Sequence, residues 1–495
     1  MAKKARRKFK AKKVEEAPPE PTTSSMDLGG SAVRGRERIS AWSDQLGRRW
    51  GRSNALPLNI APVAGFQFIP SGCFLFDWLS GGGLAVVGRT SRAWGPPDSY
   101  KTTSLLRTLA NAQRTCRYCR FPIVTSPTTG GQDCSCPNPR WWLQDESDYI
   151  WLSHPDAITI STGALPPLAT RKKIKGVGWA YVLECAPPPH LTGKKGVPAK
   201  RDIVFAEDYR NEPMRTAYCE PEGKISKVWA ESNGVDTANV MLVGGQWAEQ
   251  TLETIEDIGT SRDFDVIFLD STSMLDVKSE LEKSITDRRK VGAKATVMTR
   301  FIQKWVVAAS EEGLTGRLRP TLVTTSQVRT KGIGGGGRAY QGPTDGHAFQ
   351  HGLILDVKMS SAGFQYRQGA SVAHAGKFRF EIRKNHSGGP PRAKGIFQAW
   401  LEMGHKDRPV GDVGDLEMCM GYARGFGAGY ILEGTGKAKL TLSSSHLEGG
   451  EIKFSTVGDC AKFLRENLSI YRDLRQRTLT KCRAECAPPK LAEDK

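Results

Sequence analysis

The stretch Gly95-Pro96-Pro97-Asp98-Ser99-Tyr100-Lys101-Thr102-Thr103 constrains this chain most. A short run that can form a strand precedes it, and apolar residues at helical spacing follow it from Ser104 to Ala110. Strand, glycine-initiated loop, Lys-Thr and helix is the order of a phosphate-binding loop, in which backbone N–H groups at a helix start hold phosphate oxygens. The order predicts that Lys101 reaches the β- and γ-phosphates of a bound nucleotide and that the Thr102 hydroxyl ligates Mg²⁺.

One position departs from that pattern. Such loops have glycine before the lysine, and this chain has Tyr100. A Cβ atom there predicts crowding of the phosphates or strain in the loop. A Gly-Pro-Pro turn followed by an ordinary helix fits the motif alone equally well, so the rest of the chain has to decide.

Length and charge narrow the class of protein. The 495 residues can hold a large α/β core with smaller appendages. Lys and Arg total 71 against 52 acids, and the net charge of +19 favours a polyanionic partner, nucleic acid first, although a basic tail explains part of the excess. We find no apolar run of membrane-spanning length and no signal peptide, and the eleven cysteines favour a reducing cytoplasm over a disulfide framework.

Four cysteines stand close together after the predicted helix. They form two pairs, Cys116 with Cys119 and Cys134 with Cys136. Four thiolates in so short a span suit a tetrahedral, structural Zn²⁺ site, and four free surface thiols are the alternative.

The blocks around the loop resemble the RecA recombinase family. Three of them precede the phosphate loop in the family order: Pro70-Ser71-Gly72, Phe76-Asp77 and Gly82-Gly83-Leu84. Gly88-Arg89 is similar to the Gly-Arg that opens the family's first core strand. The resemblance implies a RecA-like P-loop ATPase core with a central, mostly parallel twisted sheet.

The resemblance also implies catalytic positions. The buried-strand pattern Asp263–Ser271 ends in Asp270, where a carboxylate orients Mg²⁺. Glu207, at the end of an apolar run, is expected to be the general base, and Glu184 is its competitor. Gln327 is expected to sense the γ-phosphate. Lys384 is expected to act on the neighbouring subunit's nucleotide, although His386 replaces the second lysine of that family block.

Two loops match the family's DNA-binding loops. The first contributes Lys283, Arg288, Arg289, Lys290 and Lys294, and the second contributes Arg329, Lys331 and Arg338. The second loop also contains four consecutive glycines, from which we expect mobility until something orders it.

Composition, cysteine spacing and the resemblance together predict the following division: a disordered basic tail (1–35), an N-terminal helix or oligomerisation segment (36–66), the ATPase core (67–114 and 201–405), a zinc-binding insertion (115–200), a small C-terminal α+β domain (406–480) and a tail (481–495). Residues 460–477 are expected to be helical.

The implied function is that of an ATP-dependent recombinase. Such a protein forms helical homo-oligomeric filaments on single-stranded DNA and pairs that strand with a duplex. The divergence and the insertion suggest a phage-type member, located in the cytoplasm of a bacterial cell or of the phage's host. A helicase or branch-processing ATPase on the same core, or a non-catalytic DNA-binding filament protein with a degenerate nucleotide site, stays open as an alternative.

Overall fold

The computed structural model describes residues 66–484, except for 118, 126, 128–131, 135–139, 144–150, 153–165, 167, 176–177, 188–191, 193–195, 209–211, 262, 285, 288–291, 315–318, 332–339, 391, 402–413, 427–429, 434–438, 445 and 448. The predicted basic tail, the N-terminal segment before residue 66 and the end after residue 484 therefore lie outside the described residues.

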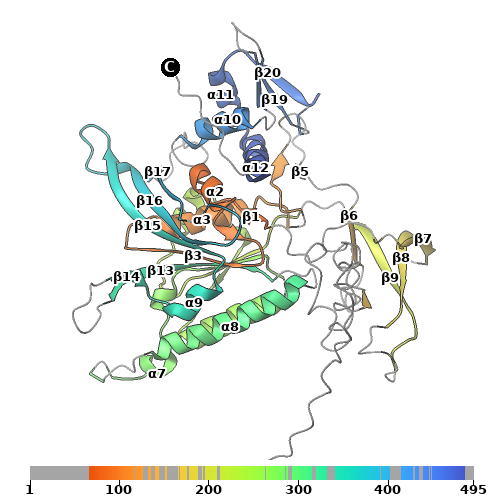
Figure 1. Cartoon of the computed structure of the whole chain (residues 1–495), viewed down its shortest axis with the longest axis horizontal. Helices are drawn as coiled ribbons and strands as arrows, with labels where there is room; N and C mark the ends of the chain where they lie inside the picture. The colour runs from red at the N-terminus through yellow and green to blue at the C-terminus, as the bar shows by residue number, and fades with distance from the viewer. Residues whose placement is uncertain are drawn as a thin grey trace, which may run out of the picture.

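A nine-stranded sheet forms the centre of the molecule, in the order β11-β10-β12-β13-β3-β15-β16-β17 with β14 paired to β13 (Figure 1). The strands from β11 to β15 pair in parallel, whereas β16, β17 and β14 pair antiparallel with their neighbours. The strands are β3 (Thr90–Gly95), β10 (Thr216–Cys219), β11 (Val240–Val243), β12 (Val266–Leu269), β13 (Thr321–Lys331), β14 (Tyr340–Pro343), β15 (Leu355–Tyr366), β16 (Ala373–Asn385) and β17 (Lys394–Trp400). This confirms the predicted α/β fold with a large, mostly parallel sheet.

Helices cover both faces of this sheet, and β12 is apolar on both sides. Val266 and Phe268 of β12 belong to the apolar cluster with α3 (Lys101–Ala112) and α5 (Lys227–Ser232). Ile267 and Leu269 belong to the cluster on the opposite face. The helices of that face are α6 (Ala248–Ser261), α8 (Ala293–Leu314) and α9 (Gly346–Gly352). Three short helical segments connect the longer elements: η4 (Thr237–Asn239), η5 (Thr272–Met274) and α7 (Lys278–Leu281).

The segment before the phosphate loop packs against the same core. It contains β1 (Phe68–Ile69), α2 (Phe74–Ser80) and β2 (Ala85–Val86). Gly83 has a φ of +157°, and a Cβ there would lie 2.0 Å from the carbonyl oxygen of Ile69. A glycine is therefore required where the chain turns back beside β1.

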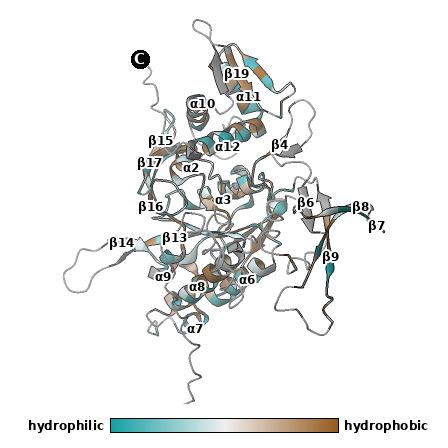
Figure 2. Ribbon diagram, turned by 45° about the vertical axis from the view of Figure 1, so that its right-hand side comes forward, coloured by the Kyte–Doolittle hydropathy of each residue, from teal (hydrophilic) through white to brown (hydrophobic). Residues whose placement is uncertain are grey.

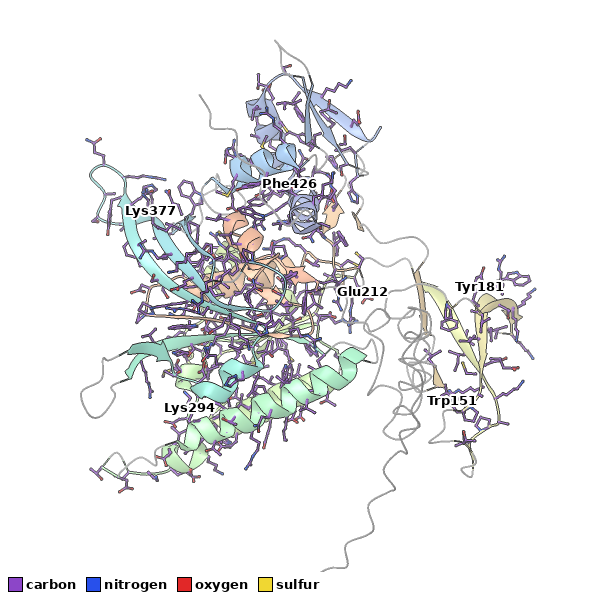
Figure 3. The ribbon with its side chains drawn as sticks, viewed as in Figure 1. Trp151, Tyr181, Glu212, Lys294, Lys377 and Phe426 are labelled. Atoms are coloured by element: carbon purple, nitrogen blue, oxygen red, sulfur yellow. The ribbon has the colours of Figure 1, made fainter. Side chains whose placement is uncertain are left out.

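A second, four-stranded antiparallel sheet stands to one side of the core, in the order β6-β9-β8-β7 (Figure 1). Its strands are β6 (Arg140–Leu143), β7 (Thr170–Ile174), β8 (Gly178–Cys185) and β9 (Arg201–Asp208). Trp151 is buried in its small apolar cluster, against which Tyr181 packs (Figure 3), while residues 170–173 of β7 are exposed and mostly hydrophilic (Figure 2). The prediction that residues 201–208 form a core strand is wrong, because β9 pairs with β6 and β8; the core resumes at β10.

The C-terminal elements form a unit on α2. They are α10 (Asp415–Gly425), β18 (Tyr430–Glu433), β19 (Lys439–Ser443), β20 (Glu451–Phe454), α11 (Val457–Glu466) and α12 (Leu468–Ala484). The hairpin of β4 (Ile123–Thr125) and β5 (Gln132–Cys134) adds Val124 to their apolar cluster. The predicted single helix over 460–477 is instead two helices, since Asn467 leaves helical geometry with φ −117° and ψ 70°.

Buried ion pairs hold this unit in place. Arg475 of α12 lies 2.7 Å from Asp77 of α2 and 3.6 Å from Asp415 of α10. Both oxygens of Asp415 accept from the backbone N–H of Phe74, at 2.9 and 2.8 Å. None of the helices that the structure describes combines the length and apolar character needed to span a bilayer.

Candidate active site

The phosphate loop connects β3 to α3 at the carboxyl edge of the central sheet. β3 is fully buried between β13 and β15. A Cβ on Gly95 would lie 2.0 Å from the carbonyl oxygen of Met359, so only glycine fits where β15 passes the loop. Ser99 Oγ donates to the carbonyl of Pro96 at 2.7 Å, which closes the turn. The predicted order of strand, loop and helix is therefore confirmed.

Tyr100 adopts the backbone conformation that explains why glycine is usual before the lysine. Its φ of 71° is left-handed, and its side chain makes no capping hydrogen bond to the first turn of α3. Its ring is buried in the core, 4.8 Å from the ring of Phe378 and 5.1 Å from that of Phe397. The left-handed φ agrees with the expected backbone strain, and the ring itself is part of the hydrophobic core.

The side chain of Lys101, the predicted phosphate-binding lysine, is bound to oxygens of its own loop. Its Nζ donates to the carbonyl of Pro96 at 2.5 Å and to Ser99 Oγ at 3.1 Å. Both acceptors belong to residues 95–103, so the Lys101 amino group is bound within its own loop. Burial lowers the pKa of Lys101, and three nearby carboxylates oppose this shift: Asp270, Asp98 and Glu222. At the start of α3, Thr102 is exposed and Thr103 is buried.

Asp270 lies directly after β12, as the strand pattern predicts. It is 9% exposed, and one carboxylate oxygen accepts from the Tyr218 hydroxyl at 2.9 Å. The other oxygen accepts from the Thr325 hydroxyl on β13. Burial, together with the charge of Asp270, raises the pKa of Tyr218 well above its ordinary value. Both oxygens of Asp270 are therefore held by hydrogen bonds, and its negative charge raises the pKa of Lys101 against the effect of burial.

Glu222 is the acidic residue that the sequence interpretation missed. It follows β10, the strand beside β12, and its Oε1 accepts from Ser271 Oγ at 2.6 Å. Its Oε2 lies 2.7 Å from Lys224 Nζ. Burial raises the pKa of Glu222, but the hydrogen bonds from Lys224 and Ser271 and the charges of Lys224 and Lys101 outweigh it, so the pKa falls below its ordinary value.

A signal for Glu222 is present in the sequence. Thr216-Ala217-Tyr218-Cys219-Glu220-Pro221-Glu222 is a short buried strand ending in acids, like the run that ends at Glu207. Glu207 instead lies on β9 of the separate sheet, and its side chain is outside the described residues. The competitor Glu184 is exposed on β8 and pairs with Lys200 at 2.6 Å.

Gln327 and Lys384 lie on strands of the central sheet. Gln327 pairs in register with Gly95, and its backbone N–H donates to Ser273 Oγ at 2.6 Å. Lys384 Nζ donates to the carbonyls at the end of α9, 3.2 Å from Gln350 O and 2.9 Å from His351 O. Gln327 is therefore beside the phosphate loop, while Lys384 is bound to its own chain near α9.

The residues predicted to contact DNA are only partly described. Lys283 lies 2.6 Å from Glu280, and Lys294 at the start of α8 donates to Ser273 O at 2.8 Å (Figure 3). Arg329 is exposed on β13, and Lys331 ends that strand opposite Tyr340. The remaining four, Arg288, Arg289, Lys290 and Arg338, lie outside the described residues.

The cysteine region is described in part. Cys116 and Cys119 are buried in one small cluster with Ile123, and Cys134 stands opposite Ile123 in the β4–β5 pair. Cys136 and the side chain of Cys134 lie outside the described residues. Within the part that the structure describes, His, Cys, Asp and Glu side chains do not form a group of three that could hold a metal.

Comparison with known proteins agrees with this arrangement. The family model of the RecA N-terminal domain matches residues 157–390, which include Asp270, Gln327 and Lys384 and begin after the phosphate loop. Protein RecA of Sulfurovum sp. (strain NBC37-1) is 28% identical over 297 residues, 58% of this chain and 79% of that protein.

Two further relatives cover less of their own length. Protein RecA of Helicobacter hepaticus is 30% identical over 173 residues, 35% of this chain and 46% of that protein. Protein RecA of Cytophaga hutchinsonii is 24% identical over 241 residues, 48% of this chain and 64% of that protein. With the parallel sheet, the phosphate loop and the carboxylate after β12, these similarities show that the chain belongs to the RecA family.

Proposed function

We propose that this protein is a DNA-dependent ATPase that acts as a recombinase. The observation that carries the proposal is the grouping of Lys101, Asp270 and Glu222 at the carboxyl edge of the sheet. Asp270 and Glu222 both oppose the lowering of the Lys101 pKa, and Lys101 lowers the pKa of Glu222. That edge is where parallel α/β sheets bind their ligands. The relatives named RecA support the same class of activity for this chain.

Each group has a distinct role in this proposal. Lys101 neutralises charge on the β- and γ-phosphates, and the first-turn N–H groups of α3 hold phosphate oxygens. Thr102 and Asp270 would hold Mg²⁺, which supplies further positive charge at the phosphate oxygens. Glu222, rather than Glu207, orients the attacking water and accepts its proton, because it follows β10 beside β12 and close to Lys101, whereas Glu207 lies on the separate sheet.

DNA binding is assigned to the surface beyond β13. Arg329 is exposed on that strand two residues after Gln327. The loop residues Arg288, Arg289, Lys290, Lys331 and Arg338, with Lys283 and Lys294, extend this basic surface in our proposal. The net charge of +19 supports a polyanionic partner. We further propose that copies of the chain assemble on single-stranded DNA and that Lys384 acts on the neighbour's nucleotide.

ATP hydrolysis measured with and without single-stranded DNA tests this function. We expect turnover that rises when single-stranded DNA is added, and strand exchange between a circular single strand and a matching duplex. DNA binding without turnover would favour the non-catalytic filament protein. Unwinding without strand exchange would favour the helicase alternative.

We also propose a structural Zn²⁺ site in the insertion. The antiparallel pairing of Ile123 with Cys134 supports it, since Ile123 packs against Cys116 and Cys119. Cys136 follows two residues later and would supply a fourth thiolate.

A further inference from the structure

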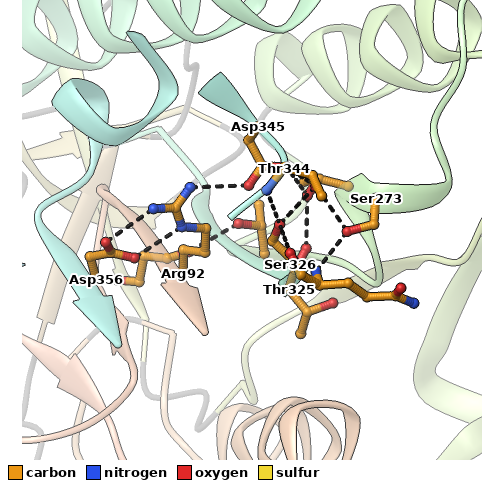
Figure 4. Close-up of polar contacts among 11 residues, drawn as sticks. Arg92, Ser273, Thr325, Ser326, Thr344, Asp345 and Asp356 are labelled. Carbon is orange, nitrogen blue, oxygen red and sulfur yellow. Dashed lines mark hydrogen bonds and ion pairs between the residues drawn. The ribbon is translucent and has the colours of Figure 1, made fainter. Parts of the chain in front are cut away.

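A buried arginine that the proposed chemistry does not use lies in β3, the strand that leads into the phosphate loop. Arg92 is fully buried. Its Nε and Nη2 donate to the two oxygens of Asp356 on β15, at 2.9 and 3.0 Å, and its Nη1 donates to Asp345 Oδ2 at 3.0 Å (Figure 4). Arg92 thus joins two carboxylates from different parts of the chain.

Asp345 differs from Asp356 in what its second oxygen contacts. Asp345 Oδ1 accepts from the Thr272 hydroxyl and, at 3.2 Å, from Thr344 Oγ1. Thr272 also lies 3.0 Å from the carbonyl of Thr325. Thr325 in turn donates its hydroxyl to Asp270, the carboxylate after β12. Asp345 is therefore connected to the proposed Mg²⁺ ligand through two threonines.

Hydrogen bonds also lead from Asp345, through Thr344, to the β13–β14 hairpin. Thr344 follows β14 directly, and its hydroxyl lies 3.1 Å from Ser326 Oγ and 3.0 Å from Ser273 Oγ. Thr344 N donates to Ser326 Oγ at 3.3 Å. Ser273 Oγ accepts from the backbone N–H of Gln327. The base of this hairpin, which carries Arg329, is therefore bonded to the same group of side chains as Asp345 (Figure 4).

We propose that Asp345 is a positioning residue that couples the state of the nucleotide site to the β13–β14 hairpin. The proposal rests on the proposed function, because it assumes that the hairpin contacts DNA. One oxygen of Asp345 is held by Arg92 and the other by Thr272 and Thr344, so the carboxylate cannot shift without breaking a buried bond. A displacement at Asp270 is passed through Thr325 and Thr272 to Asp345, and from there to Thr344.

The comparison of Asp345→Asn with Asp356→Asn tests the coupling. Each variant neutralises one of the two carboxylates bonded to Arg92, but only Asp345 also contacts Thr272 and Thr344. The measured quantity is the affinity for labelled oligo(dT) with a slowly hydrolysed ATP analogue, divided by the affinity with ADP. We expect this ratio to fall about fivefold or more in Asp345→Asn and to stay near the wild-type value in Asp356→Asn.

A milder variant keeps the test decisive if Asp345→Asn does not fold. Thr344→Val keeps the shape of the side chain and removes the hydroxyl that joins Ser326, Ser273 and Asp345, and we expect the same fall in the ratio. Equal effects of Asp345→Asn and Asp356→Asn, or a wild-type ratio in Thr344→Val, would overturn the coupling. A wild-type protein whose DNA affinity ignores the nucleotide would overturn the proposed function itself.

Discussion

The ring of Tyr100, the residue before the phosphate-loop lysine, packs 4.8 Å from the ring of Phe378 on β16. A bulky residue therefore fits at this position because its side chain belongs to the hydrophobic core. The left-handed backbone that a glycine would adopt freely is kept at a cost of about 1–2 kcal/mol. Removing the ring and relieving the strain have opposite effects on stability.

Tyr100→Gly is expected to lower the free energy of unfolding by about 2–3 kcal/mol. Loss of a buried aromatic ring costs about 3–5 kcal/mol, which exceeds the strain relieved. The folded variant should still hydrolyse ATP, since the ring packs against Phe378 and Phe397 in the core. Chemical denaturation of the variant and of the control Tyr100→Phe measures the difference. A variant more stable than the wild type would show that the ring contributes little.

Lys101→Ala is expected to abolish DNA-stimulated ATP hydrolysis. Within the phosphate loop, residues 95–103, Lys101 is the only cationic side chain, so no other group in it can neutralise the phosphates. Steady-state turnover with saturating single-stranded DNA measures this, with a thermal melt to show that the variant is folded. Wild-type turnover in the folded variant would remove the assignment of the nucleotide site.

Glu222→Gln is expected to reduce turnover by about 10²-fold or more while ATP binding persists, as for loss of a general base. Glu207→Gln is the comparison. Loss of turnover in Glu207→Gln with normal turnover in Glu222→Gln would instead identify Glu207 as the base.

The pH dependence of turnover gives a second measurement on Glu222. Its pKa is below the ordinary value of 4.5, so the base is ionised at neutral pH and is lost only as the pH falls through that lowered pKa. Lys224→Ala removes a neighbouring positive charge and should move the acid limb of the profile to higher pH. If the acid limb does not move, Glu222 is not the base in the rate-limiting proton transfer.

The double variant Arg288→Ala, Arg289→Ala is expected to weaken binding to all single-stranded sequences alike. Each lost phosphate contact should flatten the log–log salt dependence by about one unit. Titrations at several salt concentrations with an ATP analogue present measure the slope. Lys304→Ala is a control for the loss of one positive charge outside the two predicted loops, because Lys304 of α8 pairs with Glu256 of α6 at 3.3 Å. Deletion of residues 1–35 should change the slope less, and the opposite order would place the main DNA contacts in the tail.

Cys116→Ser is expected to lower the Zn²⁺ content of the purified protein and to destabilise the insertion, since metal binding at a structural site is coupled to folding. Elemental analysis of wild type and variant measures the metal, and chelator should destabilise only the wild type. Cys73→Ser is a control, because Cys73 lies near α2 and outside the four-cysteine region. A metal-free wild-type protein would defeat this prediction.

Local sequence patterns determined several parts of this protein. The order of strand, glycine-led loop and Lys-Thr helix identified β3, the phosphate loop and α3, because each step depends on neighbours in the chain. The apolar run before Asp270 identified β12 in the same way. The family resemblance added the positions of Gln327 and Lys384, and both lie on core strands.

Tertiary structure decided which acidic strand end lies close to Lys101. The runs ending at Glu207 and at Glu220–Glu222 have similar patterns, yet β9 joins the outer sheet and β10 lies between β11 and β12. The sequence pattern also did not predict the direction of the Tyr100 ring or the bonds from Arg92 to Asp345 and Asp356. All three depend on contacts between segments far apart in the chain, and a local pattern of apolar and polar residues carries no record of which distant segment will pack against it.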